Sequence, residues 1–159
     1  MENFTHTASP VFNEDSEVLI LGTFPSVKSR EARFFYGHPQ NRFWKVISAV
    51  TGCSEYDTVE KKKKMLLDNR IALWDTIKSC DVKGSSDSSI TNVVPSDLRE
   101  IMEVSHIKRI YCNGDKAYRL YNKYHLPYTG IEAVKLPSTS PANAKFTLDK
   151  LIEEWKVII

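Results

Sequence analysis

The fold is decided by the stretch Glu17-Val18-Leu19-Ile20-Leu21-Gly22, a short and largely aliphatic run that ends in glycine. A continuous apolar run of this length is typical of a strand that is buried on both faces. The loop that follows, Thr23-Phe24-Pro25-Ser26, carries a proline and two hydroxyl groups. In an open α/β sheet, ligands bind beside the loops that leave the carboxyl ends of the strands. We therefore expect a central strand here, with part of a binding site directly after it.

Three further segments have the pattern of buried strands, and they alternate with helical patterns along the chain. They are Ile71-Ala72-Leu73-Trp74, Lys108-Arg109-Ile110-Tyr111-Cys112 and Glu132-Ala133-Val134-Lys135-Leu136. This alternation predicts an α/β fold, a three-layer α/β/α arrangement with a central, mainly parallel four-stranded sheet. We expect a single domain over residues 1–159, in which residues 1–15 form a poorly ordered or peripheral N-terminal segment.

The helices are predicted from apolar residues at helical spacing between recognisable ends. We expect them at residues 29–35 (one or two turns), 41–52, 58–69, 95–104, 115–124 and 145–157. Asn41 is well placed to cap the second of these. The run Lys61-Lys62-Lys63-Lys64 predicts a solvated face on the third.

Composition argues against several classes of protein. The hydrophobic fraction of 42% and the charged fraction of 26% are ordinary for a globular domain. No apolar run approaches the roughly 18 residues that cross a bilayer, so we expect no membrane association. The N-terminus, Met1-Glu2-Asn3-Phe4-Thr5-His6, lacks the basic start and apolar middle of a secretory signal, which predicts a cytoplasmic location. The net charge of +2 is too small to indicate a polyanionic partner by itself.

Cysteines and histidines give no sign of a metal centre. Cys53, Cys80 and Cys112 are odd in number and widely spaced, so we expect three reduced thiols. The histidines are scattered, and only His38 falls in a candidate site. The motifs of phosphate loops, dinucleotide-binding folds and serine hydrolases are missing as well. We therefore expect no metal and no other cofactor.

A second unusual segment, Phe34-Phe35-Tyr36-Gly37-His38-Pro39-Gln40-Asn41-Arg42-Phe43-Trp44, crowds aromatic rings and carboxamides together. Rings stack on a flat heterocycle and amides bond its edge, so we interpret the segment as a base pocket. The alternative is an aromatic cluster that covers the end of a helix. Polar loops also follow the other strands, at residues 75–89, 113–114 and 137–143. Because parallel strands share their carboxyl ends, all of these segments should meet at one edge of the sheet.

Four blocks of sequence carry a family resemblance. They are Gly22-Thr23-Phe24-Pro25-Ser26, Tyr36-Gly37-His38-Pro39-Gln40-Asn41-Arg42-Phe43-Trp44, Leu73-Trp74-Asp75-Thr76 and Leu136-Pro137-Ser138-Thr139-Ser140-Pro141-Ala142-Asn143. Together they resemble the uracil-DNA glycosylase superfamily, and within it the hypoxanthine-DNA (deoxyinosine) glycosylase branch. The resemblance implies a monofunctional enzyme of base excision repair. Such an enzyme flips a deaminated base, chiefly hypoxanthine, out of DNA and hydrolyses its N-glycosidic bond. We expect the protein to be a monomer and its partner to be DNA.

Two positions depart from the family pattern. Phe24 stands where much of the superfamily has an Asp or Asn that handles the attacking water. Leu136 stands where the uracil-specific members have a catalytic histidine. The resemblance to the hypoxanthine branch implies Asn41 as the catalytic residue in their place. Its carbonyl would orient a water, and its dipole would favour a developing cationic sugar.

The remaining roles implied by the resemblance fall on base binding and DNA binding. Phe24 would stack on the flipped base, and Asp75 would accept a hydrogen bond from N1–H of hypoxanthine; core packing and loop capping are the alternatives. Base contacts are also predicted for Tyr36, His38 and Gln40, although Gln40 could simply face solvent. The predicted DNA contacts are hydroxyl groups, namely those of Ser26, Ser86, Ser88, Ser138, Thr139 and Ser140. A uracil- or xanthine-DNA glycosylase and a non-catalytic nucleic-acid-binding relative remain the alternative functions.

Overall fold

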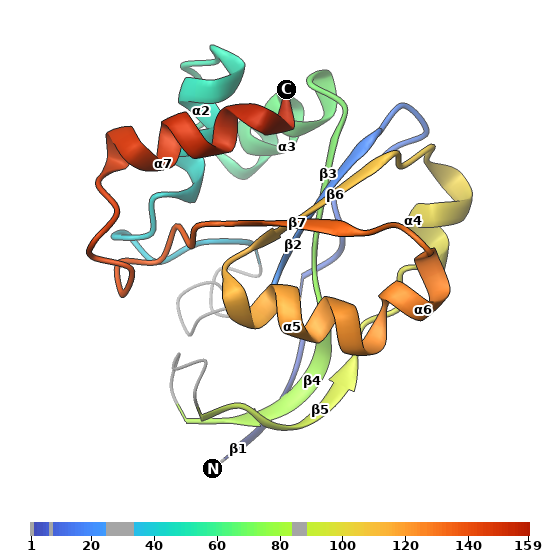
Figure 1. The fold of residues 1–159 in the computed structure, drawn as a ribbon. Coiled ribbons are helices and arrows are strands. Elements are labelled where there is room, and N and C mark those ends of the chain that lie inside the picture. Colours follow the sequence, from blue (N-terminus) through green and yellow to red (C-terminus); the bar gives the residue numbers. More distant parts are fainter. Residues whose placement is uncertain (1, 7, 25–33, 84–88) are drawn as a thin grey trace.

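A computed structural model of the chain describes residues 2–6, 8–24, 34–83 and 89–159 (Figure 1). The central sheet has four parallel strands in the order β3-β2-β6-β7. They are β2 (Val18–Gly22), β3 (Ile71–Asp75), β6 (Arg109–Asn113) and β7 (Ala133–Leu136). The predicted strands and the predicted parallel sheet are therefore confirmed. Every residue of β2 is buried, as its continuous apolar run indicated.

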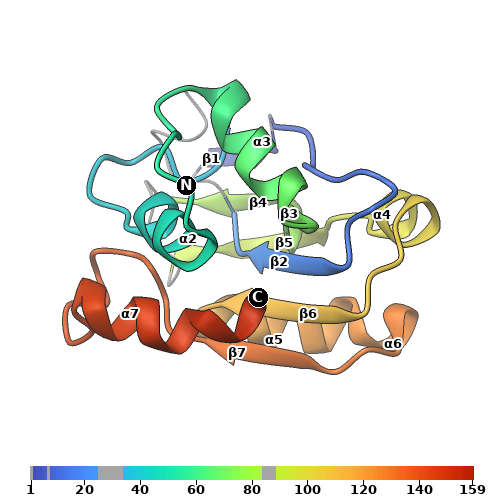
Figure 2. The ribbon, with the colours of Figure 1, turned by 90° about the horizontal axis from the view of Figure 1, so that it is seen from above.

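Helices cover both faces of this sheet, which confirms the predicted three layers (Figures 1 and 2). One face carries α2 (Phe43–Thr51), α3 (Val59–Asp68) and α7 (Leu148–Trp155), which continues into the 3-10 helix η2 (Lys156–Ile158). The other face carries α4 (Arg99–Val104), α5 (Asp115–Tyr124) and α6 (Leu126–Thr129). Successive residues of β2 serve opposite layers, because Ile20 belongs to the first core and Leu19 and Leu21 to the second.

The ends of the helices follow from capping chemistry. Thr58 and Thr147 accept backbone N–H groups at the starts of α3 and α7. Gly52 ends α2 with a φ of 74°, a left-handed conformation that glycine adopts without strain. The last helix begins later than predicted, at Leu148, because its cap is Thr147. The helix predicted from residue 95 begins only at Arg99.

A second sheet of three antiparallel strands was not predicted. Its strands are β1 (Glu2–Thr5), β4 (Ile77–Val82) and β5 (Thr91–Pro95), in the order β1-β4-β5. Buried residues in β4 alternate with polar ones, and its pairing to β5 is irregular. The sequence therefore shows only a weak apolar pattern for this strand. Within the N-terminal segment, which we expected to be poorly ordered or peripheral, residues 2–5 form β1 at the edge of this sheet.

Two predicted segments lie largely outside the described residues. The turns expected over residues 29–35 lie almost entirely outside the described residues, and so does most of the hydroxyl-rich stretch 83–90. Within the described ranges, no helix is both long and apolar enough to cross a membrane.

Candidate active site

The carboxyl ends of the parallel strands bring polar groups to one edge of the sheet. Gly22 ends β2 and Asp75 ends β3, and the two residues are paired in register. Asn113 ends β6, on the other side of β2. The segment of residues 34–44 lies against the same edge, because Asn113 Nδ2 donates to Tyr36 Oη at 3.1 Å. The predicted convergence is confirmed for these segments.

Asn41 is held by two hydrogen bonds to its side-chain carbonyl. Its Oδ1 accepts from the backbone N–H of Phe43 at 2.9 Å and from Thr139 Oγ1 at 2.9 Å. A backbone N–H can only donate, which fixes the orientation of the carboxamide. The sequence-based expectation that this carbonyl orients a water is wrong for this arrangement, because both of its lone pairs are used. The Nδ2 group donates to no other residue of the described ranges, so it is the part of Asn41 that can meet a ligand.

Thr139 links Asn41 to the end of the sheet. Its side chain is completely buried, and its hydroxyl accepts from Asn113 Nδ2 at 3.0 Å. Its backbone N–H donates to Asn113 Oδ1 at 3.0 Å. From the sequence we expected Thr139 to contact DNA, but a buried and fully bonded hydroxyl supports Asn41 instead. Asn113 was not selected from the sequence as a site residue, and it completes the connection to Tyr36.

The serines of the loop after β7 remain accessible. Ser138 Oγ and Ser140 Oγ each accept a hydrogen bond from a nearby backbone N–H, so each hydroxyl keeps its hydrogen to donate. Both serines line a cavity of about 540 Å³ that also includes Phe146. Neither Asn41 nor Asp75 lines this cavity, so it is separate from the candidate base site.

Arg42 fixes the same loop to the start of α2. Its backbone N–H donates to the carbonyl of Thr139 at 3.1 Å. Its guanidinium donates to the carbonyls of Ser140 at 2.9 Å, Asn143 at 3.2 Å and Phe146. The planar fork of arginine suits several acceptors at once. This half-buried charge therefore organises the loop.

Asp75 is a buried carboxylate whose partner comes from the N-terminal segment. Its exposed fraction is only 4%. His6 Nε2 lies 2.7 Å from Asp75 Oδ2. Our expectation that only His38 falls in a candidate site is therefore wrong. No local sequence signal could have indicated this pair, because 69 positions separate its members.

The other residues predicted to contact the base differ in their burial and in their contacts. Phe24 is partly buried and meets the His6 ring edge-on, with 5.9 Å between centroids. Tyr36 stacks on Phe43 at 4.0 Å in a left-handed conformation, with a φ of 53°. His38 Nδ1 is bound by the backbone N–H of Gln40 at 3.1 Å, and the Gln40 side chain is exposed.

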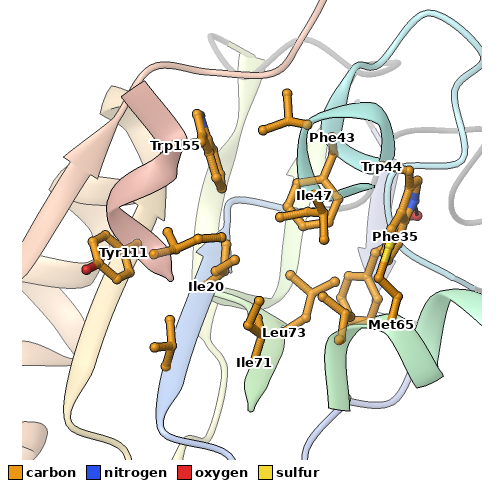
Figure 3. Close-up of a cluster of buried hydrophobic side chains, with 14 of the residues drawn as sticks. Ile20, Phe35, Phe43, Trp44, Ile47, Met65, Ile71, Leu73, Tyr111 and Trp155 are labelled. Atoms are coloured by element: carbon orange, nitrogen blue, oxygen red, sulfur yellow. Dashed lines mark hydrogen bonds between the residues drawn. The ribbon is translucent and has the colours of Figure 1, made fainter. Parts of the chain in front are cut away.

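Much of the aromatic segment packs in the core, which confirms the alternative of an aromatic cluster for these residues, whereas the base pocket stays a prediction. Phe34, Phe35 and Trp44 are buried in the core, where Phe34 and Trp44 stack with 5.7 Å between centroids. Figure 3 shows Phe35, Phe43 and Trp44 in the cluster of buried side chains that also includes Ile20 and Leu73. These residues anchor the segment, which leaves Tyr36, His38 and Asn41 at the edge of the sheet.

The geometry just described agrees with a family assignment. A family model for the uracil DNA glycosylase superfamily matches residues 9–158. The chain belongs to this superfamily. The match covers both the central sheet and the final helix, so it concerns the whole α/β core of the molecule.

Individual members of the uracil DNA glycosylase superfamily are also similar over most of the chain. A hypoxanthine DNA glycosylase of Methanosarcina acetivorans is 37% identical over 152 residues, which are 93% of each chain. A hypoxanthine DNA glycosylase of Methanosarcina barkeri is 29% identical over 141 residues, 86% of each chain. A solution NMR structure from M. acetivorans, provisionally described as a uracil DNA glycosylase, has a TM-score of 0.78 and 34% identity. The matched region covers 95% of this chain and 96% of the chain in that structure.

This superfamily member does not carry the usual groups at two strand ends. Phe24 follows β2 and packs beside the core of the antiparallel sheet. Leu136 is the last residue of β7 and is buried. Neither side chain can activate a water, so the chemistry at this edge depends on other described polar groups, among them Asn41, Asp75 and Tyr36. Three predicted DNA contacts, Ser26, Ser86 and Ser88, lie outside the described residues.

Metal ligands and reactive thiols do not add to this site. No cluster of three or more candidate metal ligands occurs within the ranges that the structure describes. All three cysteines are free. Burial raises the pKa of the Cys112 thiol to about 12, so it stays protonated at neutral pH and is a poor nucleophile.

Proposed function

We propose that this protein is a monofunctional DNA glycosylase that removes hypoxanthine, the deamination product of adenine, from DNA. The observation that carries the proposal is that the buried carboxylate of Asp75, at the end of β3, and the side chain of Asn41, held by Thr139, lie at the same carboxyl edge of the parallel sheet. The relatives named hypoxanthine DNA glycosylase support the choice of base.

Asp75 offers a way to distinguish hypoxanthine from adenine. Hypoxanthine carries a hydrogen on N1, whereas adenine presents a lone pair there. A carboxylate oxygen accepts from the first and repels the second. Uracil, xanthine and guanine also carry a ring N–H, so Asp75 alone does not exclude them, and the walls formed by Phe24 and Tyr36 must contribute to selection. Base flipping brings the target into such a pocket.

Asn41 contributes through its amide nitrogen. An N–H of Nδ2 holds the oxygen of a water, which leaves a lone pair of that water to face C1′ of the sugar. A general base is not essential if the glycosidic bond breaks largely before attack, as oxocarbenium-like cleavage of glycosides permits. The positioning of a water by a fixed group lowers the entropic cost of the attack. This mechanism agrees with the loss of acid and base groups at Phe24 and Leu136.

Ser138 and Ser140 are the described residues best placed to contact the DNA backbone. Both keep a hydroxyl hydrogen to donate, and hydroxyl groups commonly contact phosphate oxygens. We retain Ser26, Ser86 and Ser88 as predicted contacts from the sequence.

An excision assay tests the proposal directly. A duplex with a single deoxyinosine is incubated with the protein and then cleaved at abasic sites with alkali. We expect strand cleavage with the wild type and a loss of about a hundredfold or more with Asn41→Ala. Equal cleavage by the two proteins, or none by the wild type, would refute the proposal. We also expect no adduct with DNA on borohydride treatment, because hydrolysis needs no Schiff base.

Uracil is a second candidate substrate, favoured by the description of the similar NMR structure. The same duplex with deoxyuridine or deoxyxanthosine in place of deoxyinosine ranks the three lesions. Binding of inosine-containing DNA without any turnover would instead indicate a non-catalytic relative.

A further inference from the structure

His6 comes to the site from outside the α/β core. It follows β1 directly, and its backbone N–H donates to the carbonyl of Lys78 on β4 at 2.7 Å. Its side chain reaches Asp75, and the side chains of both residues are almost fully shielded, with exposed fractions of 3% and 5%. The antiparallel sheet thus delivers a histidine to the candidate base-reading carboxylate.

The hydrogen-bonding roles of the His6 ring are fixed by its surroundings. The backbone N–H of Ala8 donates to His6 Nδ1 at 3.1 Å. Because Nδ1 accepts, the ring hydrogen resides on Nε2, which therefore donates to Asp75 Oδ2. Trp74 packs on the ring with 4.4 Å between centroids, and Phe35 contacts it at 5.8 Å. The ring has little freedom to turn.

This contact determines which oxygen of Asp75 can meet a base. Oδ2 is bound to His6, whereas Oδ1 lies close to Gly22, on the side that Tyr36 Oη also approaches. A methyl group on Gly22 would lie 2.5 Å from Asp75 Oδ1 and 2.7 Å from Tyr36 Oη. Within the part of the chain that the structure describes, no hydrogen bond to Asp75 Oδ1 is found. A buried carboxylate oxygen without a donor is costly, so Oδ1 is suited to an N–H of a ligand.

The main chain around Asp75 is held separately from the side chain. Ser96 Oγ donates to the carbonyl of Asp75 at 2.7 Å, and the N–H of Thr76 donates to the carbonyl of Gly22 at 2.8 Å. These bonds fix the backbone but leave the carboxylate free to rotate. His6 is the described residue that restrains this rotation.

We propose that His6 is a positioning residue that holds Asp75 so that its Oδ1 accepts N1–H of the flipped base. This inference rests on the proposed function, because it concerns how the same site selects hypoxanthine. His6 itself contacts neither the base nor the sugar in this arrangement. It sets selectivity by fixing the direction of the acceptor.

The test compares two ligands that differ at N1, which carries a hydrogen in only one of them, and at C6. Duplexes carry 2′-fluorinated deoxyinosine, which resists cleavage, or 2′-fluorinated purine deoxyriboside, which lacks both N1–H and O6. Dissociation constants are measured by fluorescence anisotropy. We expect the wild type to prefer the inosine duplex by about ten- to a hundredfold, as a hydrogen bond to a charged group implies.

Two variants of His6 distinguish the effect of its hydrogen-bond donor from the effect of its aromatic ring. His6→Phe keeps an aromatic ring against Trp74 but removes the hydrogen on Nε2, and we expect it to reduce the preference about tenfold. It should leave binding of the purine duplex within about twofold, because that ligand makes no N1 hydrogen bond. His6→Gln restores an N–H donor and should recover most of the preference. In an Asp75→Ala background, His6→Phe should have no further effect on the preference.

The outcomes distinguish this inference from the proposed function. If His6→Phe weakens binding of both duplexes equally, or if His6→Gln restores nothing, His6 has only a structural role. An unchanged preference in both variants overturns the inference in the same way. Failure of the wild type to release hypoxanthine from a cleavable deoxyinosine duplex refutes the proposed function instead.

Discussion

Replacement of Thr139 by valine isolates the support of Asn41 from the rest of the site. Valine has nearly the shape of threonine, so the buried space stays filled. The change removes the hydroxyl that donates to Asn41 Oδ1 and accepts from Asn113 Nδ2. Each of those groups keeps one partner, because Asn41 still accepts from Phe43 and Asn113 still donates to Tyr36. No polar atom of the two carboxamides is therefore stranded by the substitution.

The expected magnitudes follow from this count. Two neutral hydrogen bonds with net values of about 1 kcal/mol each give a loss of roughly 1–3 kcal/mol in the free energy of unfolding. For a domain of this size, that corresponds to a fall of roughly 2–12 °C in Tm. The carboxamide of Asn41 loses one of its two restraints, and we expect the excision rate to fall by about ten- to a hundredfold.

Single-turnover excision of hypoxanthine and thermal unfolding should be measured for the same set of variants. Thr139→Ser keeps the hydroxyl and should retain most of the activity. Thr129→Val is a matched control, since that hydroxyl bonds Tyr121 beside α6, at the far end of the sheet from the site (Figure 1). We expect the control to lower Tm without lowering the rate. Wild-type excision by Thr139→Val, together with a lowered Tm, would refute a catalytic role for this link.

Three other substitutions have expected outcomes. Gly22→Ala places a methyl group 2.5 Å from Asp75 Oδ1, so we expect single-turnover excision to fall by about a hundredfold; half of the wild-type rate would contradict this. Arg42→Lys exchanges a planar fork for a point charge, and urea unfolding should show a loss of roughly 2–3 kcal/mol, whereas no loss would mean that the carbonyl contacts are idle. Burial lowers the pKa of His125, which donates to the carbonyl of Thr76, so the unfolded chain binds a proton more readily. Its contribution to stability is present above the unfolded pKa of about 6.5 and is lost as pH falls through the lower folded pKa. His125→Gln should lack this part of the pH dependence of urea unfolding, and identical profiles for both proteins would contradict the assignment.

The α/β core could be predicted because its signals are local. The apolar run of β2 and the bounds of α5, residues 115–124, were both visible in the sequence. Strand β4 was missed because its alternation is interrupted and its pairing is irregular. The N-terminal strand is short and gains its order from pairing with β4, a partner that the sequence does not reveal.

The positions of the candidate residues at the edge of the sheet could be predicted better than the directions of their side chains. The strand-end rule located Asp75 and the loop of Thr139, but it could not say that one contacts His6 and that the other faces inward. Asn41 was selected correctly as a polar group at the sheet edge. The use of its carbonyl by Phe43 and Thr139 depends on contacts that spacing does not encode. Side-chain direction in loops is set by tertiary packing, so it could not be predicted from the sequence.

The contacts of Arg42 with backbone carbonyls have a consequence for the approach of a polyanion. The oxygen is the negative end of a backbone carbonyl. A loop whose carbonyl oxygens faced a DNA duplex would therefore repel the phosphates. Arg42 turns the carbonyls of Ser140, Asn143 and Phe146 toward its own guanidinium. These three oxygens are thereby paired with a positive charge inside the protein chain, so we expect the loop to present less negative potential to a polyanion than it would without Arg42.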